Sequence, residues 1–186
     1  MGLPEIFISF QTAAVSAITR SARGVLAVAV KDATAGGATE AAYKSLAEVP
    51  EDKFSPENYR LLKLAFLAAP TKVWVLRVGE DAEKTYQALE RLRFDWLAAP
   101  GLEDARVMSF IKTLRNGGRG VKAVVANATA PDCEGIVNLC VSGLTLEDGA
   151  MEAKDYAVRV AALLAALPLT RSATYVNLPE VVGCDA

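Results

Sequence analysis

Strand and helix signals alternate along the middle of this 186-residue chain, and that order constrains its fold more than any other feature. Ser55-Pro56-Glu57 is a helix start, because it combines a capping serine, a first-turn proline and an acid near the positive helix end. The expected elements are a strand at 25–30, a helix at 56–68, a strand at 72–78, a helix capped by Asp81, a strand at 94–99, a helix carrying Val107 to Leu114 and a strand at 121–126. Such an order implies right-handed crossovers and a parallel sheet.

The last third of the chain continues this pattern less regularly. Residues 135–142 have the character of another strand, and residues 176–182 that of an extended segment. Between them, residues 153–167 form an alanine-rich helix that is apolar nearly all round and is interrupted by Arg159. We expect this helix to be buried on most of its sides.

The two ends of the chain do not fit this α/β body. Residues 5–10 place Ile6, Ile8 and Phe10 on one side of an extended strand, with Phe7 on the other. Residues 11–23 are small and polar, carry Arg20 and Arg23, and show no helical stripe or strand alternation. We therefore expect an α/β fold with a mostly parallel or mixed sheet, helices packed on it and an extended N-terminal arm. The expected divisions are an arm at 1–23, a core at 24–182 and a tail at 183–186.

Composition narrows the classes of function. The chain has no histidine, which removes the commonest general base, the usual catalytic triads and most transition-metal sites. A net charge of −2 gives no reason to expect a nucleic acid partner, and no apolar run is long enough for membrane insertion. Cys133, Cys140 and Cys184 form no close pair, which favours reduced, buried thiols over a disulfide framework or a zinc site.

Two stretches that contain glycine could be mistaken for ligand sites. Residues 116–120, Asn-Gly-Gly-Arg-Gly, follow a helix and precede a strand, the reverse of the order in a phosphate loop, so we interpret them as a helix end and turn. Pro100-Gly101 leads from a strand into a helix, where an open α/β sheet often binds ligands. No nucleophile, dinucleotide fingerprint or Walker lysine accompanies it. We therefore assign no catalytic, cofactor-binding or metal-binding residue and expect no cofactor.

The tetrapeptide Thr-Arg-Ser-Ala occurs twice, at residues 19–22 and 170–173. Both copies lie at the edge of apolar stretches, where Arg20 and Arg171 must be either solvated or paired. Two interpretations remain open. The repeat is a coincidence of two surface arginines, or each arginine makes a charge-assisted pair with a carboxylate of the same or another subunit.

Longer stretches around these arginines resemble a known family. Residues 2–10 and 17–25 are similar to the opening of tail sheath proteins of contractile phages and defective prophages. Further segments similar to the same family lie at 58–66, 94–101, 111–115, 121–127 and 134–138. The most specific block runs from 161 to 175 and contains Leu-Pro-Leu-Thr-Arg-Ser-Ala-Thr-Tyr. The resemblance extends over residues 2–182 in the order of the family.

This resemblance implies a structural subunit, not an enzyme, in the contractile tail sheath of a phage or phage-like particle. Such a subunit polymerises around the tail tube and contracts to drive injection. The implied partners are copies of itself in hexameric rings stacked into a helical tube, the tail tube protein and the baseplate. The implied location is the virion tail, and the bacterial host cytoplasm during assembly.

The arm at 1–23 is then a segment that adds a strand to the sheet edge of a neighbouring subunit. The candidate residues for contacts between subunits are Ile6, Ile8, Phe10, Arg20, Arg23 and Arg171. Sheath subunits usually continue beyond the Thr-Arg-Ser-Ala-Thr-Tyr block into a C-terminal region, so we expect the core at 24–182 to lack that region. The alternative interpretation of the strand and helix order is a small Rossmann-like ligand-binding domain or enzyme, which the absence of histidine and of a glycine fingerprint disfavours.

Overall fold

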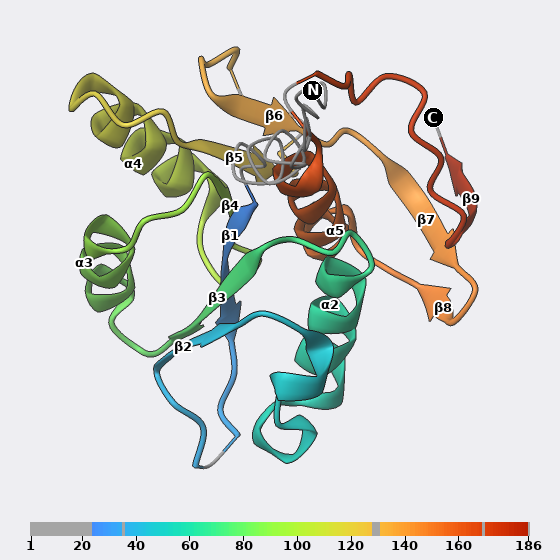
Figure 1. The fold of residues 1–186 in the computed structure, drawn as a ribbon, viewed down its shortest axis with the longest axis horizontal. Coiled ribbons are helices and arrows are strands. Elements are labelled where there is room, and N and C mark those ends of the chain that lie inside the picture. The colour runs from blue at the N-terminus through green and yellow to red at the C-terminus, as the bar shows by residue number, and fades with distance from the viewer. Residues whose placement is uncertain (1–23, 35, 128–130, 169, 186) are drawn as a thin grey trace, which may run out of the picture.

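The computed structural model describes residues 24–34, 36–127, 131–168 and 170–185, which form stacked layers of helices and sheets (Figure 1). The strands are β1 Val25–Lys31, β2 Glu40–Tyr43, β3 Lys72–Val78, β4 Trp96–Ala98, β5 Lys122–Val125, β6 Ile136–Asn138, β7 Ser142–Leu146, β8 Gly149–Ala150 and β9 Val181–Asp185. The helices are α2 Pro56–Phe66, α3 Ala82–Arg91, α4 Asp104–Asn116 and α5 Ala153–Ala166, and two short 3-10 helices, η1 Leu46–Glu48 and η2 Glu51–Lys53, precede α2. No helix in these described ranges is both long and apolar enough to cross a membrane.

The helix ends follow the local sequence signals. The Ser55 hydroxyl accepts a hydrogen bond from the Asn58 N–H at 3.2 Å and caps α2, and the Asp81 carboxylate accepts one from the Glu83 N–H at 3.0 Å and caps α3. Helix α4 ends at Asn116, and Gly118 has a φ of 84°, which favours glycine. Residues 116–120 are therefore a helix end and turn, as the sequence predicts.

The main sheet has six strands in the order β2-β3-β1-β4-β5-β6. Strands β3, β1, β4, β5 and β6 run parallel, and β2 pairs antiparallel with β3 at one edge. In the centre, β1 pairs with β3 without interruption from Val25↔Lys72 to Lys31↔Val78. The predicted α/β fold with a mostly parallel sheet is confirmed, while the edge strand β2 was not expected.

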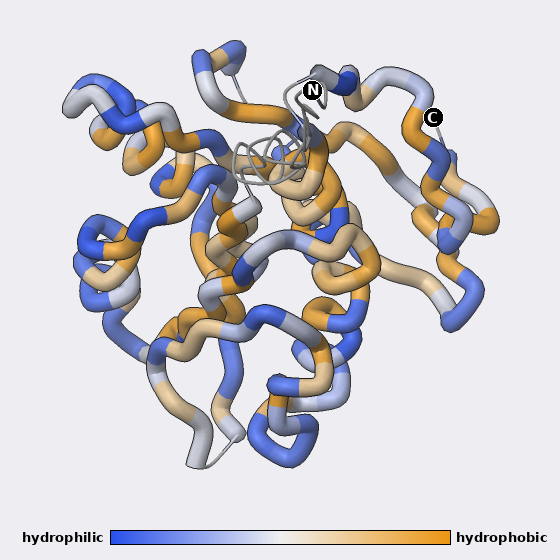
Figure 2. The backbone as a smooth tube through the Cα atoms, in the orientation of Figure 1, coloured by the Kyte–Doolittle hydropathy of each residue, from blue (hydrophilic) through white to orange (hydrophobic). Residues whose placement is uncertain are grey.

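Helices cover both faces of the main sheet. In β1, Leu26 and Val28 pack against α2 and α5, whereas Ala27 and Ala29 pack with the residues of α3 and α4. A strand that is buried on both faces carries a continuous apolar run, which explains the Val-Leu-Ala-Val-Ala-Val sequence. Figure 2 shows that hydrophobic residues gather in the central strands, whereas hydrophilic residues lie on the outer sides of helices α3 and α4.

A small antiparallel sheet, with the order β8-β7-β9, lies on the outer side of α2 and α5 (Figure 1). Leu144 and Leu146 of β7 form an apolar cluster with Leu64 of α2 and Tyr156 of α5. Helix α5 is thus enclosed between the main sheet and the small sheet, which confirms that it is buried on most sides. Residues 183–185, which follow the predicted core, belong to β9, in which Gly183 pairs with Thr145 of β7.

Two ionic contacts join the small sheet to the helices. The Arg159 Nε of α5 donates a hydrogen bond to the Glu180 carboxylate at 2.6 Å, and the Tyr156 hydroxyl donates to the same carboxylate at 2.9 Å. Arg60 of α2 forms a two-bond ion pair with Asp148 at the β7–β8 turn, with Nε 2.7 Å from the carboxylate. Burial raises the pKa of Glu180, but the hydrogen bonds from Arg159, the backbone and Tyr156, with the charge of Arg159, together outweigh it, so the pKa lies below its ordinary value.

Candidate assembly surfaces

Five of the six candidate contact residues lie outside the described residues, so their roles stay predictions. They are Ile6, Ile8, Phe10, Arg20 and Arg23. The sixth, Arg171, lies after the end of α5 and its side chain is exposed. Its surroundings show what the second Thr-Arg-Ser-Ala copy can contact.

Arg171 lines a shallow groove of about 210 Å³, which we call the amino-end groove because it lies where β4 and β5 begin. The residues that line it are Asp95, Trp96, Gly120, Lys122, Leu164, Leu167, Pro168, Arg171 and Ala173. Lys122 Nζ lies 5.3 Å from the centre of the Trp96 ring, within the range of a cation–π contact. The groove is therefore lined by two cations and one aromatic ring.

The same edge of the main sheet is basic beyond the amino-end groove. A neighbouring hollow shares Asp95 and Gly120 with it, and the described residues lining the two include five cations and two carboxylates. The cations are Arg91, Arg93, Arg119, Lys122 and Arg171, and the carboxylates are Glu90 and Asp95. Helices α3 and α4 end at this edge, where basic residues are stabilised by the negative ends of the helices. This local positive charge contrasts with the net charge of −2 for the whole chain.

Gly24, the first residue of the predicted core, lies at this same edge. It directly precedes β1, whose Val25 N–H donates to the Asp95 carboxylate at 3.2 Å. A side chain at residue 24 would overlap with Thr71, so the close approach of these two segments requires glycine. The point at which the predicted arm would join the core is therefore beside the basic edge that carries Arg171.

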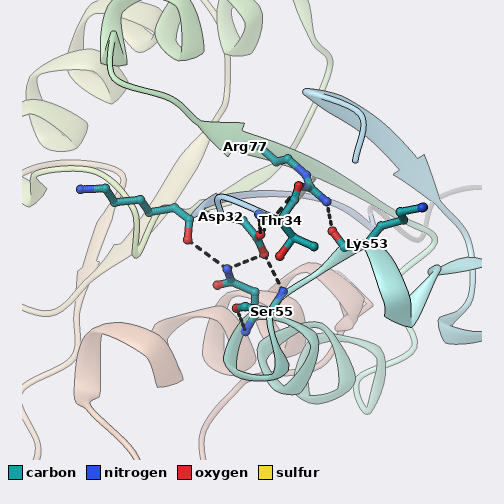
Figure 3. Close-up of polar contacts among 7 residues, drawn as sticks. Asp32, Thr34, Lys53, Ser55 and Arg77 are labelled. Atoms are coloured by element: carbon teal, nitrogen blue, oxygen red, sulfur yellow. Dashed lines mark hydrogen bonds and ion pairs between the residues drawn. The ribbon is translucent and has the colours of Figure 1, made fainter. Parts of the chain in front are cut away.

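The opposite end of the main sheet holds a buried polar network (Figure 3). Asp32 follows β1, and its carboxylate accepts hydrogen bonds from the Thr34 N–H at 2.8 Å, the Ser55 N–H at 2.9 Å and the Asn58 side-chain amide at 2.8 Å. The Arg77 guanidinium of β3 lies 3.7 Å from this carboxylate and donates to the carbonyl oxygens of Thr34 and Lys53. The network thus joins the ends of β1 and β3 to the segment before α2.

The Asp32 carboxylate acts here as an anchor. Burial raises its pKa, but the hydrogen bonds from Ser55, Thr34 and Asn58 outweigh that effect and lower the pKa from 3.8 to about 2. The group is therefore ionised at neutral pH, and its hydrogen-bond partners belong to this chain. A groove of about 940 Å³ borders Asp32 and Arg77, yet the described contacts of these two side chains are to backbone and side-chain groups of this same chain.

The Pro100-Gly101 turn has a packing role. The Gly101 N–H donates to the Ala29 carbonyl oxygen at 3.0 Å, and a Cβ at residue 101 would lie only 2.6 Å from the Lys31 nitrogen. The turn therefore rests on the backbone of β1 at the carboxyl ends of the parallel strands, where an open α/β fold would bind a ligand. This contact supports the interpretation of residues 100–101 as a structural turn.

The polar network supports an exposed acidic segment, residues 48–57. Its carboxylates belong to Glu48, Glu51, Asp52 and Glu57, and all four residues are exposed. Lys53 is its one cation, with Nζ 3.1 Å from the Asp52 carboxylate. The ribbon in Figure 1 shows this segment at the end of the molecule opposite the last turn of α5.

The two tryptophans contribute to the core only in part. Trp74 and Trp96 are half-buried beside Lys72 and Lys122 and pack against the apolar clusters of the main sheet. The cysteines were expected to be buried. This expectation is wrong, because Cys140 and Cys184 are exposed and Cys133 is half-buried. Cys133 and Cys140 lie on either side of the edge strand β6, and Cys184 lies in β9 of the small sheet.

No protein-family profile matches the chain. The tail sheath protein of Clostridium phage phiCD119 is 32% identical to it over 197 residues, an alignment that covers 97% of this chain and 53% of that protein. The chain thus spans about half the length of this curated relative.

Three solved structures share the fold. For the sheath tail protein from Desulfitobacterium hafniense the TM-score is 0.74 at 15% identity, and the match covers 98% of this chain and 66% of that chain. For the sheath tail protein from Listeria innocua the TM-score is 0.73 at 16% identity, and the match covers 91% of this chain and 64% of that chain. For a chain in the cryo-EM structure of the anti-feeding prophage baseplate the TM-score is 0.61 at 11% identity, and the match covers 100% of this chain and 59% of that chain.

The α/β body therefore has the fold of solved sheath tail proteins. Sequence identity along nearly the whole chain identifies the relation more closely: the protein is a homologue of phage tail sheath proteins, which confirms the resemblance carried by its motifs. This relation favours a structural sheath subunit over the Rossmann-like ligand-binding domain or enzyme.

Proposed function

We propose that this chain forms part of the structural subunit of a contractile tail sheath, which surrounds the tail tube of a phage or phage-like particle and contracts to drive injection. The observation that carries the proposal is the sequence match to a tail sheath protein along nearly the whole chain. The fold shared with two sheath tail proteins supports it.

The partners follow from this role. They are further copies of the subunit, arranged as hexameric rings stacked into a helical tube, the tail tube protein, and the baseplate, to which the anti-feeding prophage neighbour belongs. The location is the virion tail, reached after assembly in the bacterial host cytoplasm. Residues 1–23 act as an arm in which Ile6, Ile8 and Phe10 line one side of a strand that joins a neighbouring subunit.

The core is suited to move as one body during contraction. Both faces of the main sheet are packed with apolar side chains, and a close-packed interior transmits force without deforming. Additional apolar surface buried between subunits in the contracted state supplies the free energy. The arms keep the subunits connected while the bodies rotate and shift. On this proposal contraction requires no nucleotide.

Electron microscopy tests this proposal. The protein, expressed from its complete coding frame, should form tubes that are visible by negative staining without added nucleotide. The variant Ile8→Asp should abolish the tubes and leave the far-UV circular dichroism spectrum unchanged, because it puts a charge on the contact side of the arm. The matched variant Phe7→Asp lies on the other side of the predicted strand and should retain them. A monodisperse monomer at all concentrations would contradict the proposal.

A further inference from the structure

The amino-end groove and the acidic segment lie at opposite ends of the main sheet. Trp96 and Lys122 of the groove are the first residues of β4 and β5, so the groove lies at the amino ends of the parallel strands. The acidic segment is tied to Asp32, which follows the last residue of β1, so it lies at the carboxyl ends. Because β1 and β4 are parallel, the two surfaces of one molecule are separated by the length of the sheet.

Their charges are complementary. Exposed Lys122 and Arg171 line the groove together with Trp96, and its one lining carboxylate, Asp95, accepts a hydrogen bond from the Val25 N–H. The acidic segment has four exposed carboxylates and one lysine. An arginine guanidinium binds a carboxylate through two parallel hydrogen bonds, and opposite patches of this kind fix both partner and orientation.

The acidic segment is held in a fixed conformation before any partner binds. Arg77 donates to the Lys53 carbonyl oxygen, the Ser55 N–H donates to Asp32, and the Phe54 ring lies 4.7 Å from the Arg77 guanidinium. The backbone on both sides of Phe54 is therefore anchored, while the side chains of Glu51 and Asp52 stay exposed. A preordered surface loses less conformational entropy on binding than a flexible loop does.

We propose that the amino-end groove binds the acidic segment of a second copy of this chain, with Glu51 and Asp52 facing Lys122 and Arg171. The contact rests on the proposed polymerisation of the subunit and adds to it a specific interface between globular cores, separate from the predicted arm. It joins two different surfaces, so each bound copy leaves one groove and one acidic segment free. Such a head-to-tail contact does not close on itself as a two-fold dimer does, and it extends into a chain of subunits.

The proposed contact can be tested in the 186-residue protein by reversing the charges of the groove and of the acidic segment. The groove variant is Lys122→Glu/Arg171→Glu, and the segment variant is Glu51→Lys/Asp52→Lys. All four substituted residues are exposed, so both variants should fold, which circular dichroism checks. The control for the groove variant is Lys84→Glu/Lys112→Glu, which makes the same change in net charge as that variant at exposed positions of α3 and α4.

Sedimentation velocity measures the result. The wild-type protein should self-associate at an ionic strength of about 0.01 M and dissociate at about 1 M, because salt screens exposed charges. Each double variant should lower the association constant about tenfold or more, equivalent to about 1.4 kcal/mol, and the control should not. An equimolar mixture of the two variants should associate again, because each acidic surface then meets a basic one.

A wild-type protein that stays monomeric at low salt, a groove variant that associates like the wild type, or a mixture that stays monomeric would each overturn this contact. These results are distinct from failure of the proposed function. Tubes that form unchanged in both variants would exclude the contact and leave the sheath proposal standing. Salt-sensitive association that the mixture restores, without tubes from the complete protein, would support the contact and contradict the sheath proposal.

Discussion

The main sheet and the small sheet of this molecule are held in place by different forces. In the main sheet, β1 and β3 pair in unbroken register, and Leu26, Val28 and Leu76 are at most 1% exposed. In the small sheet, the pairing of β7 with β9 shifts register twice between Ser142 and Leu146. Val182 of β9 is 68% exposed, so apolar burial contributes little to the stability of this side of the strand.

The difference indicates which part behaves as a rigid body. Apolar burial stabilises the main sheet cooperatively, so its strands and helices should open only on global unfolding. The small sheet depends more on a few contacts, chiefly the Arg159–Glu180 and Arg60–Asp148 pairs and the cluster around Leu144. It should therefore open locally, at a lower free energy than the main sheet. The following variants test this contrast.

Leu76→Ala in β3 should have the largest effect, because it empties space in the cluster that packs α3 and α4 onto the sheet. We expect the free energy of unfolding to fall by about 2–5 kcal/mol. Guanidinium denaturation followed by circular dichroism measures this change. Leu67→Ala is the control, since Leu67 is 61% exposed, and it should change stability by no more than about 0.5 kcal/mol. Equal effects of the two variants would refute the assignment of the main sheet as the stable core.

Arg159→Met should have an intermediate effect that is confined to the small sheet. It leaves the Glu180 carboxylate, which is 12% exposed, without its cationic partner. The Tyr156 hydroxyl still donates to this carboxylate, so the cost is that of one hydrogen bond to a charged group, about 1.5–3 kcal/mol, and local opening toward water limits it. Hydrogen exchange should become faster in β7 and β9 and stay unchanged in β1 and β3.

A double-mutant cycle isolates the pair. In Arg159→Met/Glu180→Leu the buried charge is absent, so part of the lost stability should return. Destabilisation that is simply additive, or faster exchange throughout β1, would show that the two residues do not act as a local link between α5 and the small sheet.

Most of the main sheet could be predicted from the sequence because its signals are local. The cap at Ser55, the cap at Asp81 and the apolar run after Gly24 each specify an element without knowledge of distant residues. Strand β2 could not be predicted in this way. Its sequence Glu-Ala-Ala-Tyr has little strand propensity, and the strand forms because it pairs with the exposed edge of β3.

The small sheet offered a signal that the sequence analysis missed. Leu144 and Leu146 alternate with polar residues and precede Asp148-Gly149, a dipeptide typical of tight hairpins. Strand β9 was placed several residues too early, because its pairing with β7 depends on residues nearly forty positions apart, which no local pattern reports.

The surroundings of Arg171 were predictable only in part. The repeated Thr-Arg-Ser-Ala drew attention to this residue, but its neighbours Trp96 and Lys122 come from two other segments of the chain. They approach Arg171 because β4 and β5 pair in parallel and α5 ends beside their first residues. The basic character of this edge was available from sequence, since the helices before these strands end in Arg91 and Arg115.

Arg60→Ala should have the smallest effect on stability and still separate the two sheets. Arg60 joins α2 to the β7–β8 turn through Asp148 and through the carbonyl oxygens of Gly149 and Ala150. Because Asp148 is 58% exposed, the loss in free energy should be about 0.2–1 kcal/mol and should shrink as salt is added. Arg106→Ala is the matched control, since it breaks the exposed pair with Glu83 between α4 and α3 and touches no strand of the small sheet. Hydrogen exchange should increase at the β7–β8 turn in the first variant alone, and an equal increase in both would mean that Arg60 has no specific part in holding the hairpin on α2.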